Sequence, residues 1–424
     1  MIEWKEFALE EVVEKFIDYR GKTPKKTASG VPLITAKIVK NGRINTPNEF
    51  IALEDYDKWM TRGIPQKGDV VMTTEAPLGE VAQLCFDGKV ALAQRIITMR
   101  GKVNVLDNGF LKYMLQSPLM QHRIHSRSSG TTVIGIKSSE LKKIPIPVPP
   151  IDIQKKIASI LGSIDEKIEL NLKMNKTLEE MAMTLYKHWF VDFGPFQDGE
   201  FMESELGMIP KGWEVVSLGN LIEIKHGYAF KSKYFSESGD YIVLTPGNFK
   251  ENGGIKSKGE KEKFYNGDFP KQYLLNEGDL LVVMTDLVAE APLLGSPAFI
   301  NENDKYLHNQ RLGKVILKDE NQTDIFYIYE TLNSPYVRNI IRAGASGTTV
   351  KHTSPSRIEE IKVINPPSEI QKQFGQYLSG FFNLIKNNEK EVRDLQATRD
   401  FLLPRLLSGE IDLSKAEKQV EKVL

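Results

Sequence analysis

Two long stretches of the chain carry their hydrophobic residues at alternating spacings of three and four, the pattern of a coiled-coil helix. The first stretch follows Pro149-Pro150, and the second follows Pro366-Pro367. The seam of the first reads Ile157, Leu161, Ile164, Ile168, Asn171, Asn175, Leu178, Ala182, Leu185 and Trp189. The seam of the second reads Phe374, Leu378, Phe381, Ile385, Asn388, Val392, Leu395, Arg399, Leu402 and Leu406. Each position of the second seam lies 217 residues after its counterpart, so the pattern predicts two long helices built to one plan.

The repeat also covers the segments that precede each long helix. Trp4 and Leu9 are matched by Trp213 and Leu218. Further matched pairs are the glycine turns at 20–26 and 226–233, the Gly-Asp strands at 68–72 and 278–282, the Glu-Ala-Pro loops at 75–79 and 290–295, the Gln-Arg pairs at 94–95 and 310–311, and the Ser-Gly-Thr-Thr turns at 129–132 and 346–349. Residues 40–64 and 250–273 show no comparable agreement. A shared scaffold with divergent loops is expected if two copies recognise two different targets.

These patterns predict an α+β protein with two pseudo-symmetric, mixed α/β globular domains joined by two long helices. The second helix can bury its seam only against the first, and the chain then requires an antiparallel coiled coil. In that arrangement we expect Asn171 to face Asn388 and to fix the register. The predicted segments are a first globular domain at 1–150, a helix at 151–195, a second globular domain at 196–367, a helix at 368–410 and a tail at 411–424.

Three local expectations concern the second helix. Ser368 with Gln371 three residues later has the spacing of a capping box. Pro404 falls within the seam, where proline predicts a kink or an early end. The last dozen residues are expected to be disordered, as chain ends often are.

Composition describes an ordinary globular protein, with 41% hydrophobic and 26% charged residues. Cys85 is the only cysteine, which predicts neither disulfides nor a cysteine zinc site. Met1-Ile2-Glu3-Trp4 does not resemble a signal peptide, and no apolar run suggests a membrane span, so we expect a cytoplasmic protein. The zero net charge hides an asymmetry: residues 1–150 hold 22 Lys and Arg against 16 Asp and Glu, whereas residues 196–367 hold 19 against 24.

Several segments imitate catalytic motifs without completing them. Asn365-Pro366-Pro367-Ser368 resembles the loop of amino-methyltransferases but ends in serine, and residues 130–137 lack the Gly-Lys-Ser/Thr of a phosphate-binding loop. His122 and His125 have no ligand partners that would complete a metal site, so surface or phosphate-facing histidines are expected. Asp165-Glu166-Lys167 is interpreted as a solvated face of the coiled coil. We therefore expect no catalytic residue and no metal site in this chain.

The assembled motifs resemble one family, the specificity subunit of type I restriction–modification systems. The resemblance covers nearly the whole chain and depends on several motifs in order: the paired prolines that open each long helix, 189–193 after the first helix, 209–214 at the start of the second globule, and 402–411 at the end of the second helix. The sequence departs from the family pattern at Ile153, where many members have Glu before the Gln.

The resemblance implies that each globule is a target recognition domain that reads one half of a bipartite, asymmetric site in double-stranded DNA. It implies that the helices set the gap between the half-sites and bind two methyltransferase subunits, with restriction (motor) subunits joining for cleavage. No cofactor is then expected in this chain, because S-adenosylmethionine, ATP and magnesium belong to the partner subunits. No membrane partner is expected.

Glycine turns with hydroxyl and basic neighbours are suited to phosphate oxygens. The candidate DNA-binding residues of the first globule are Arg20, Lys22, Thr23, Lys25, Lys26, Ser129, Thr131 and Thr132. Those of the second are Lys225, Tyr228, Lys231, Ser232, Ser346, Thr348, Thr349 and Lys351. The divergent loops 37–67 and 248–273 are candidates for base readout. Simple turn chemistry is the alternative for the Ser-Gly-Thr-Thr turns, and internal hydrogen bonding is the favoured interpretation of the Gln-Arg pairs.

Two other functions remain open at this point. The chain could be an N6-adenine DNA methyltransferase itself, which binding of S-adenosylmethionine to the isolated chain would reveal. It could also be a coiled-coil scaffold that binds proteins only, which a gel shift with duplex DNA would distinguish.

Overall fold

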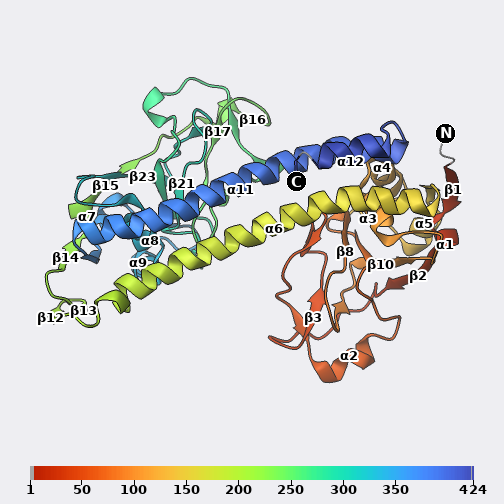
Figure 1. Ribbon diagram of the computed structural model, residues 1–424, viewed down its shortest axis with the longest axis horizontal. Helices are drawn as coiled ribbons and strands as arrows, with labels where there is room; N and C mark the ends of the chain where they lie inside the picture. Colours follow the sequence, from red (N-terminus) through yellow and green to blue (C-terminus); the bar gives the residue numbers. More distant parts are fainter. Residues whose placement is uncertain (1–3, 422) are drawn as a thin grey trace. The chain divides into compact units, whose positions relative to one another are not determined.

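The computed structural model describes residues 4–421 and 423–424 (Figure 1). Residues 1–3, which belong to the stretch for which the sequence predicts no signal peptide, lie outside the described residues, as does residue 422. No described helix combines the length and the apolar character needed to cross a membrane. The chain forms two compact units: unit 1 combines Met1–Leu172 with Lys390–Leu424, and unit 2 is Lys173–Glu389.

Unit 1 is built around a four-stranded antiparallel sheet with the strand order β2-β10-β7-β8. Its strands are rich in Val, Ile and Met, and their side chains form apolar cores on both sides of the sheet. The strands of the unit are β1 (Lys5–Ala8), β2 (Val13–Asp18), β3 (Val31–Ile34), β4 (Val39–Lys40), β5 (Arg43–Ile44), β6 (Phe50–Ile51), β7 (Val70–Thr74), β8 (Leu78–Gln83), β9 (Ala91–Leu92), β10 (Ile96–Gly101) and β11 (Pro145–Val148). Its short helices are α1 (Leu9–Val12), α2 (Leu53–Trp59), α3 (Asn108–Gln116), α4 (Pro118–Ser126) and α5 (Ser138–Lys142).

Unit 2 repeats this topology with the strand order β15-β23-β19-β21. Its strands are β12 (Phe201–Ser204), β13 (Gly207–Pro210), β14 (Glu214–Ser217), β15 (Ile222–His226), β16 (Phe235–Ser236), β17 (Ile242–Val243), β18 (Phe264–Tyr265), β19 (Leu280–Val283), β20 (Thr285–Asp286), β21 (Pro297–Phe299), β22 (Tyr306–Leu307), β23 (Leu312–Leu317), β24 (Lys351–His352) and β25 (Lys362–Asn365). Its short helices are α7 (Leu218–Leu221), α8 (Ile325–Asn333), α9 (Pro335–Ala343) and α10 (Pro355–Glu359), with 3-10 turns η1 (Gly194–Phe196), η2 (Ser232–Tyr234), η3 (Pro246–Asn248), η4 (Gly259–Lys261) and η5 (Lys271–Tyr273).

Equivalent residues start equivalent helices in the two units. Asp107 caps α3 by accepting a hydrogen bond from Phe110 N, and Asp324 caps α8 by accepting from Tyr327 N. Ser117 and Ser334 cap the next helix in each unit, and proline occupies the following position in both. The repeated Ser-Pro pairs of the sequence are therefore helix starts.

The two long helices are α6 (Ile151–Phe190) and α11 (Ser368–Ser408). They are antiparallel: in unit 1 Asp165 of α6 meets Arg399 of α11, and in unit 2 Asn175 of α6 meets Asn388 of α11. The predicted fold class, two repeated α/β domains with an antiparallel pair of long helices, is thus confirmed. The first helix ends five residues before the predicted boundary at 195, and η1 follows it.

The predicted seam positions lie between the helices. The buried apolar ones are Ile157, Leu161, Ile164, Ile168, Leu178, Ala182, Phe374, Leu378, Ile385, Val392, Leu395, Leu402 and Leu406. Leu185, Trp189 and Phe381 are partly buried and pack against the core of unit 2. Burial of these apolar side chains along both helices is the main contribution of the seam to stability.

Two predictions about the seam are wrong. Asn171 does not face Asn388: its side-chain amide donates to Glu391 at 2.8 Å, whereas Asn388 donates to Asn175 at 2.8 Å. The antiparallel helices are thus shifted by one turn from the expected register. Asp165 is not part of a solvated face, because it accepts hydrogen bonds from Lys112 Nζ at 2.6 Å and from Tyr113 Oη at 2.7 Å.

The glutamine that follows each proline pair is a clamp rather than part of a capping box. Gln371 Oε1 accepts from Asp324 N at 3.2 Å, and its Nε2 donates to Pro366 O at 2.8 Å. Gln154 bonds in the same way to Asp107 N and Pro149 O, both at 2.8 Å. Both glutamines are fully buried, so each ties the start of a long helix to the helical layer of its own globule.

The end of the chain also differs from expectation. α11 continues through Pro404 to Ser408 instead of ending there. The predicted disordered tail contains an ordered helix, α12 (Leu413–Val420), which Asp412 caps by accepting from Ser414 N at 2.9 Å. Ala416 and Val420 of α12 are buried, and this burial explains why the segment is folded.

Candidate nucleic-acid interface

In unit 1, three predicted segments meet at one end of the main sheet, where β2 and β7 finish and β8 and β10 begin. Arg20, in the turn after β2, donates from Nη2 to Ile136 O at 2.7 Å. Thr23, in the same turn, donates from Oγ1 to Gln94 Oε1 at 3.2 Å. Residues 20–23, 94–95 and 129–136 therefore form one loop cluster, which we call the unit 1 loop cluster.

The Ser-Gly-Thr-Thr segment of this cluster is a tight loop closed by its own backbone. Ser129 N donates to Gly135 O at 2.8 Å, and Gly135 N donates to Ser129 O at 3.0 Å. Gly130 has φ +119°, and a Cβ there would lie 2.1 Å from Val133 O, so the loop requires glycine. Turn chemistry thus explains Ser129 and Gly130, whereas Thr131 and Thr132 stay exposed with their hydroxyls available to a ligand.

Main-chain bonds fix this loop to the sheet. Ile136 N donates to Thr74 O at 3.0 Å, and Thr74 N donates to Arg95 O at 2.9 Å. Arg95 also forms an ion pair with Glu75, with 3.1 Å between Nε and Oε1. In unit 1 the Gln-Arg pair therefore has internal partners, as the favoured interpretation predicts. The exposed Lys137 follows the loop directly, and sequence reasoning missed it because the second repeat has serine at that place.

The basic segment 22–26 leaves the loop cluster and passes along α2. Lys22 and Lys25 are exposed, and no described residue forms an ion pair with Lys25. Lys25 lines a shallow pocket of about 270 Å³ together with Thr23 and Trp59. Lys26 is partly neutralised by Glu49, with 2.7 Å between the charged atoms. Lys22 and Lys25 are therefore the cations of this segment that are most available to a phosphate.

Unit 2 has a corresponding cluster. Gly227 approaches Asn309 so closely that a Cβ would lie 2.2 Å from its carbonyl oxygen. The next residue, Tyr228, donates from N to His308 O at 2.8 Å and accepts at O from Gln310 N at 3.0 Å. Arg311 O accepts from Met284 N at 2.9 Å. In this unit the Gln-Arg pair thus contributes main-chain bonds.

The second Ser-Gly-Thr-Thr loop has the same construction. Ser346 N donates to His352 O at 2.9 Å, His352 N returns a bond at 3.0 Å, and a Cβ on Gly347 would lie 2.0 Å from Val350 O. Thr348 and Thr349 are exposed. Thr285 Oγ1 lies 3.0 Å from His352 Nδ1 and joins the loop to the end of the sheet. Residues 227–228, 309–311 and 346–352 make up the unit 2 loop cluster.

The other candidates of unit 2 surround this cluster. Lys225 is exposed on β15 with its Nζ 3.8 Å from Glu223, and Lys231 and Ser232 are exposed at the start of η2. Lys351 is half-buried in β24, where it pairs across the ladder with Asp286. A carboxylate beside Lys351 weakens the attraction of this lysine for a phosphate.

The divergent loops contain a structural match that the sequence did not reveal. In unit 1, β4 and β5 form a hairpin in which Val39 pairs with Ile44, and in unit 2 Phe249 pairs with Ile255. Both hairpins contact α6 by ion pairs, Arg43 with Glu169 and Lys250 with Glu179. The first part of each predicted readout loop therefore connects its globule to α6 by an ion pair.

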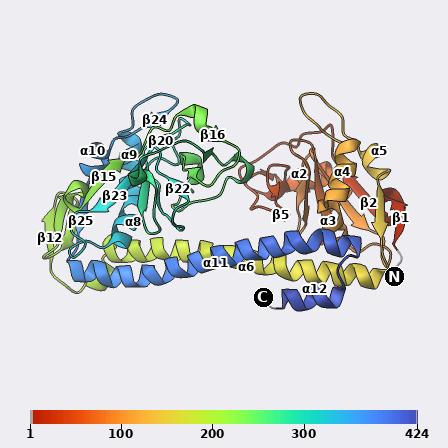
Figure 2. The same ribbon diagram turned by 90° about the horizontal axis from the view of Figure 1, so that it is seen from above.

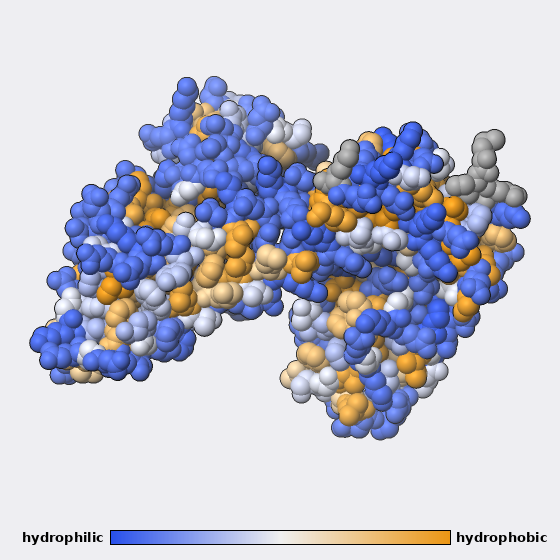
Figure 3. Space-filling view, in the orientation of Figure 1, coloured by the Kyte–Doolittle hydropathy of each residue, from blue (hydrophilic) through white to orange (hydrophobic). Residues whose placement is uncertain are grey.

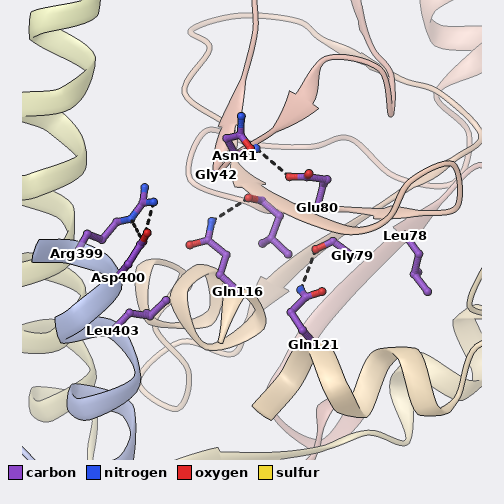
Figure 4. A pocket seen from close by; sticks show the side chains of 11 residues that line it. Asn41, Gly42, Leu78, Gly79, Glu80, Gln116, Gln121, Arg399, Asp400 and Leu403 are labelled. Atoms are coloured by element: carbon purple, nitrogen blue, oxygen red, sulfur yellow. Dashed lines mark hydrogen bonds and ion pairs between the residues drawn. The ribbon is translucent and has the colours of Figure 1, made fainter. Parts of the chain in front are cut away.

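Figure 4 shows the hairpin of unit 1 beside α11. Asn41 N at its tip donates to Glu80 at 2.8 Å, and Gln116 of α3 donates to Val81 O at 2.9 Å. These residues line a pocket of about 320 Å³ whose far wall is Arg399 and Asp400. The pocket lies between the hairpin and the helix.

Beyond the hairpins the two units differ. In unit 1, α2 places Trp59 in a stacked contact with Tyr19, with ring centroids 5.3 Å apart. In unit 2, η5 places Tyr273 next to Tyr228, with centroids 5.1 Å apart. These segments, 53–62 and 264–273, are the parts of the predicted readout loops that combine proximity to the loop clusters with unlike side chains.

His122 and His125 are exposed, as expected, whereas another histidine is buried. His308 is buried, its Nε2 lies 2.9 Å from Leu312 O, and burial lowers its pKa to about 4. It is therefore neutral at physiological pH. Among the residues that the structure describes, no group of three or more His, Cys, Asp and Glu side chains is placed to hold a metal ion.

Comparisons with known proteins agree with this architecture. A relative from Methanocaldococcus jannaschii, named type I restriction enzyme MjaIX specificity subunit, is 29% identical over 355 residues, covering 81% of this chain and 78% of its own length. A relative from Haemophilus influenzae, named type I restriction enzyme HindI specificity subunit, is 24% identical and covers 97% of this chain and all of its own. The crystal structure of the type I restriction–modification S subunit from M. genitalium has the same fold, with a TM-score of 0.57, 18% identity and 96% of each chain covered.

The family model for the type I restriction modification DNA specificity domain matches residues 1–180 and 210–395. These ranges include the first globule, most of the second globule and most of both long helices. The chain therefore belongs to the family of type I restriction–modification specificity subunits.

Proposed function

We propose that each unit binds one half of a bipartite, asymmetric site in double-stranded DNA. The observation that carries this proposal is the repeated loop cluster: the same backbone framework stands at the same end of equivalent sheets, while the flanking segments differ. A repeated framework with unlike side chains suits two half-sites with a common backbone and different bases.

Within each cluster the framework supports phosphate contacts. In unit 1 the phosphate ligands are Arg20, Lys22, Lys25 and the hydroxyls of Thr131 and Thr132. Their counterparts in unit 2 are Lys225, Lys231, Ser232, Thr348 and Thr349. Hydroxyl, backbone and cationic donors of this kind position a protein on the duplex without reading its sequence. Segments 53–62 and 264–273 supply the base contacts.

The chain itself is non-catalytic in this proposal. Two methyltransferase subunits bind along α6 and α11, and restriction subunits join them for cleavage. S-adenosylmethionine, ATP and magnesium are held by those partners. The paired long helices support this division, because they offer an extended surface to partners and a rigid element that sets the gap between half-sites.

The decisive experiment measures that gap. One heptad is inserted into both long helices, after Leu172 in α6 and after Glu389 in α11, so that the seam stays in phase. Seven residues lengthen each helix by about 10.5 Å at 1.5 Å per residue, which corresponds to roughly three base pairs at 3.4 Å each. Methylome sequencing of cells that carry the complex should report the same half-sites with a longer gap.

The matched control inserts the heptad into α6 alone, which breaks the pairing of the helices and should abolish methylation. An unchanged gap in the double-insertion variant, with methylation intact, would show that the helices do not set the spacing. Failure of the unmodified chain to bind DNA with its methyltransferase partner would refute the proposal as a whole.

A further inference from the structure

Unit 2 contains an apolar pocket that the proposed function does not use. It lies where α8, α9 and β25 meet the C-terminal end of α6 (Figure 2) and has a volume of about 640 Å³. Apolar side chains form most of its wall, among them Met183, Phe190 and Val363. Two further lining residues, Val191 and Tyr336, are 55% and 47% exposed, and Figure 3 shows hydrophobic side chains at the surface of this unit. A small molecule can therefore enter the pocket from solvent.

Most polar groups of the wall already have partners. Tyr186 Oη donates to Thr331 Oγ1 at 3.1 Å, and Ser334 Oγ donates to Thr331 O at 2.7 Å. Lys187 Nζ donates to Asp192 Oδ1 at 2.7 Å. These groups have little hydrogen-bonding capacity left for a ligand.

Glu330 and Asn333 of α8 are the exceptions. They line the pocket and are only 2% and 6% exposed. Asn333 Nδ2 donates to Asn252 O at 2.9 Å, but its Oδ1 is buried and no described residue donates to it. Burial raises the pKa of Glu330 to about 8 against a hydrogen bond with Asn333, and the charge of Glu179 adds to the rise. A carboxyl and an acceptor oxygen thus share the pocket, and none of the groups that shift this pKa is a cation.

Unit 1 supplies cations where unit 2 has none. The repeat relates Lys112 to Tyr329, Tyr113 to Glu330 and Arg399 to Ala182. In unit 1, Lys112 and Arg399 both donate to the buried carboxylate of Asp165. In unit 2, neither counterpart of these two cations carries a charge at neutral pH. Charge complementarity in unit 2 therefore calls for a cation from outside the chain.

We propose that this pocket binds a small primary amine with an aromatic or aliphatic body. The ammonium group donates to the Glu330 carboxylate and to Asn333 Oδ1, and the apolar body packs against Met183, Phe190 and Val363. An ammonium has three N–H donors and serves both acceptors at once, whereas an alcohol has one donor. Hydrogen bonds between charged groups are stronger than neutral ones, and the aromatic rings of the wall also attract a cation. This inference does not rest on the proposed function.

Binding of the amine releases a proton. Before binding, Glu330 is mostly protonated at pH 7, and the free amine is an ammonium ion. In the complex, Glu330 is a carboxylate paired with that ammonium, so the carboxyl proton passes to solvent. Affinity for the amine should therefore rise nearly tenfold between pH 6 and pH 7 and level off above pH 8.

The test uses the full-length chain and three related ligands: 2-phenylethylamine, 2-phenylethanol and 3-phenylpropionate. Calorimetry at pH 7 in two buffers of different ionisation enthalpy measures both the affinity and the number of protons released. The amine should bind at least tenfold more tightly than the alcohol, because its hydrogen bonds are charged. It should release close to one proton, whereas the alcohol should release none and the carboxylate should bind most weakly.

A pair of variants assigns the effect to the carboxyl. Glu330→Gln keeps the shape of the side chain and removes the acid. It should lower the affinity for the amine at least tenfold and abolish proton release, with the affinity for the alcohol within about twofold. The matched control is Glu180→Gln, because Glu180 is exposed on α6 and pairs only loosely with Lys176, at 3.7 Å. The control should bind all three ligands as the unmodified chain does.

Ligand selectivity and proton release of the unmodified chain test the proposal independently of any variant. Equal affinity for the amine and the alcohol would overturn it, as would amine binding without proton release. Amine binding that Glu330→Gln leaves unchanged would place the ligand elsewhere and overturn the assignment. Absence of binding by the amine would overturn it too.

Discussion

Asn388 of α11 donates a hydrogen bond to Asn175 of α6 at 2.8 Å in the buried seam of unit 2. A buried amide pair stabilises little by itself but penalises every register in which one amide loses its partner. The sequence places asparagine in both helices, but the repeat relates Asn388 to Asn171. The pairing with Asn175 arises because the antiparallel helices meet one turn away from the position that the repeat suggests.

Replacing Asn388 alone should be costly. Asn388→Leu leaves the Asn175 carbonyl oxygen buried without its partner, and we expect a loss of about 1–3 kcal/mol in the free energy of unfolding. Adding Asn175→Leu should restore much of this loss, because two leucines fit an apolar seam. Urea unfolding of the unmodified chain, of Asn388→Leu, of Asn175→Leu and of the double variant gives a double-mutant cycle. Additive losses would mean that the two amides do not interact.

The Asp165 network should depend on pH. Burial alone would raise the pKa of Asp165, but Lys112, Tyr113 and Arg399 outweigh burial and hold that pKa below its usual value of 3.8. The stabilisation is therefore complete above the unfolded pKa and is lost as the pH falls through the lower folded pKa. Unfolding midpoints between pH 2 and pH 6 should show this loss.

Asp165→Asn removes the charge that Lys112 and Arg399 share, and we expect it to cost about 3–5 kcal/mol at pH 7. The matched control is Glu166→Gln, whose side chain is exposed. The acid dependence described above should be weaker in Asp165→Asn than in the control. Identical acid profiles for the two variants would remove Asp165 from the explanation.

Ionisation of Glu330 should destabilise the folded protein, whereas ionisation of Asp165 stabilises it. Glu330 is 2% exposed, lines an apolar pocket of about 640 Å³ in unit 2, and burial raises its pKa to about 8. Because the unfolded carboxyl ionises near 4.5, stability falls as the pH rises from the unfolded pKa to the folded one. Glu330→Gln should therefore stabilise the protein by about 3 kcal/mol at pH 7 and by little at pH 4. Stabilisation that does not change with pH would contradict this explanation.

The basic segment of unit 1 allows a comparison of neighbouring lysines. Lys25→Ala should weaken binding to all DNA sequences and reduce the slope of log K against log salt by about one unit. Lys26→Ala should have a smaller effect, because Glu49 already neutralises that cation. Fluorescence anisotropy over a range of salt concentrations gives both slopes. An unchanged slope for Lys25→Ala would place that residue outside the interface.

The sequence by itself determined the repeat, the two long helices and their antiparallel pairing. The heptad spacing, the proline pairs and the matched turns are local signals, each readable within a few residues. The antiparallel pairing follows from the order in which the repeat places the globules and the helices along the chain. The glycines of the loop clusters belong to the same class, since Gly130 and Gly347 are required by the geometry of their own loops.

Only the tertiary structure decided which residues meet across the chain. The register of Asn175 with Asn388, the pairing of Asp165 with Lys112, the clamps of Gln154 and Gln371 and the hairpins that brace on α6 all join segments that are distant in sequence. The folding of α12 is a similar case, because a helix of that length is marginal alone and becomes stable when Ala416 and Val420 are buried. Spacing within a segment is a local property, whereas the partner of a buried polar group depends on how whole elements pack.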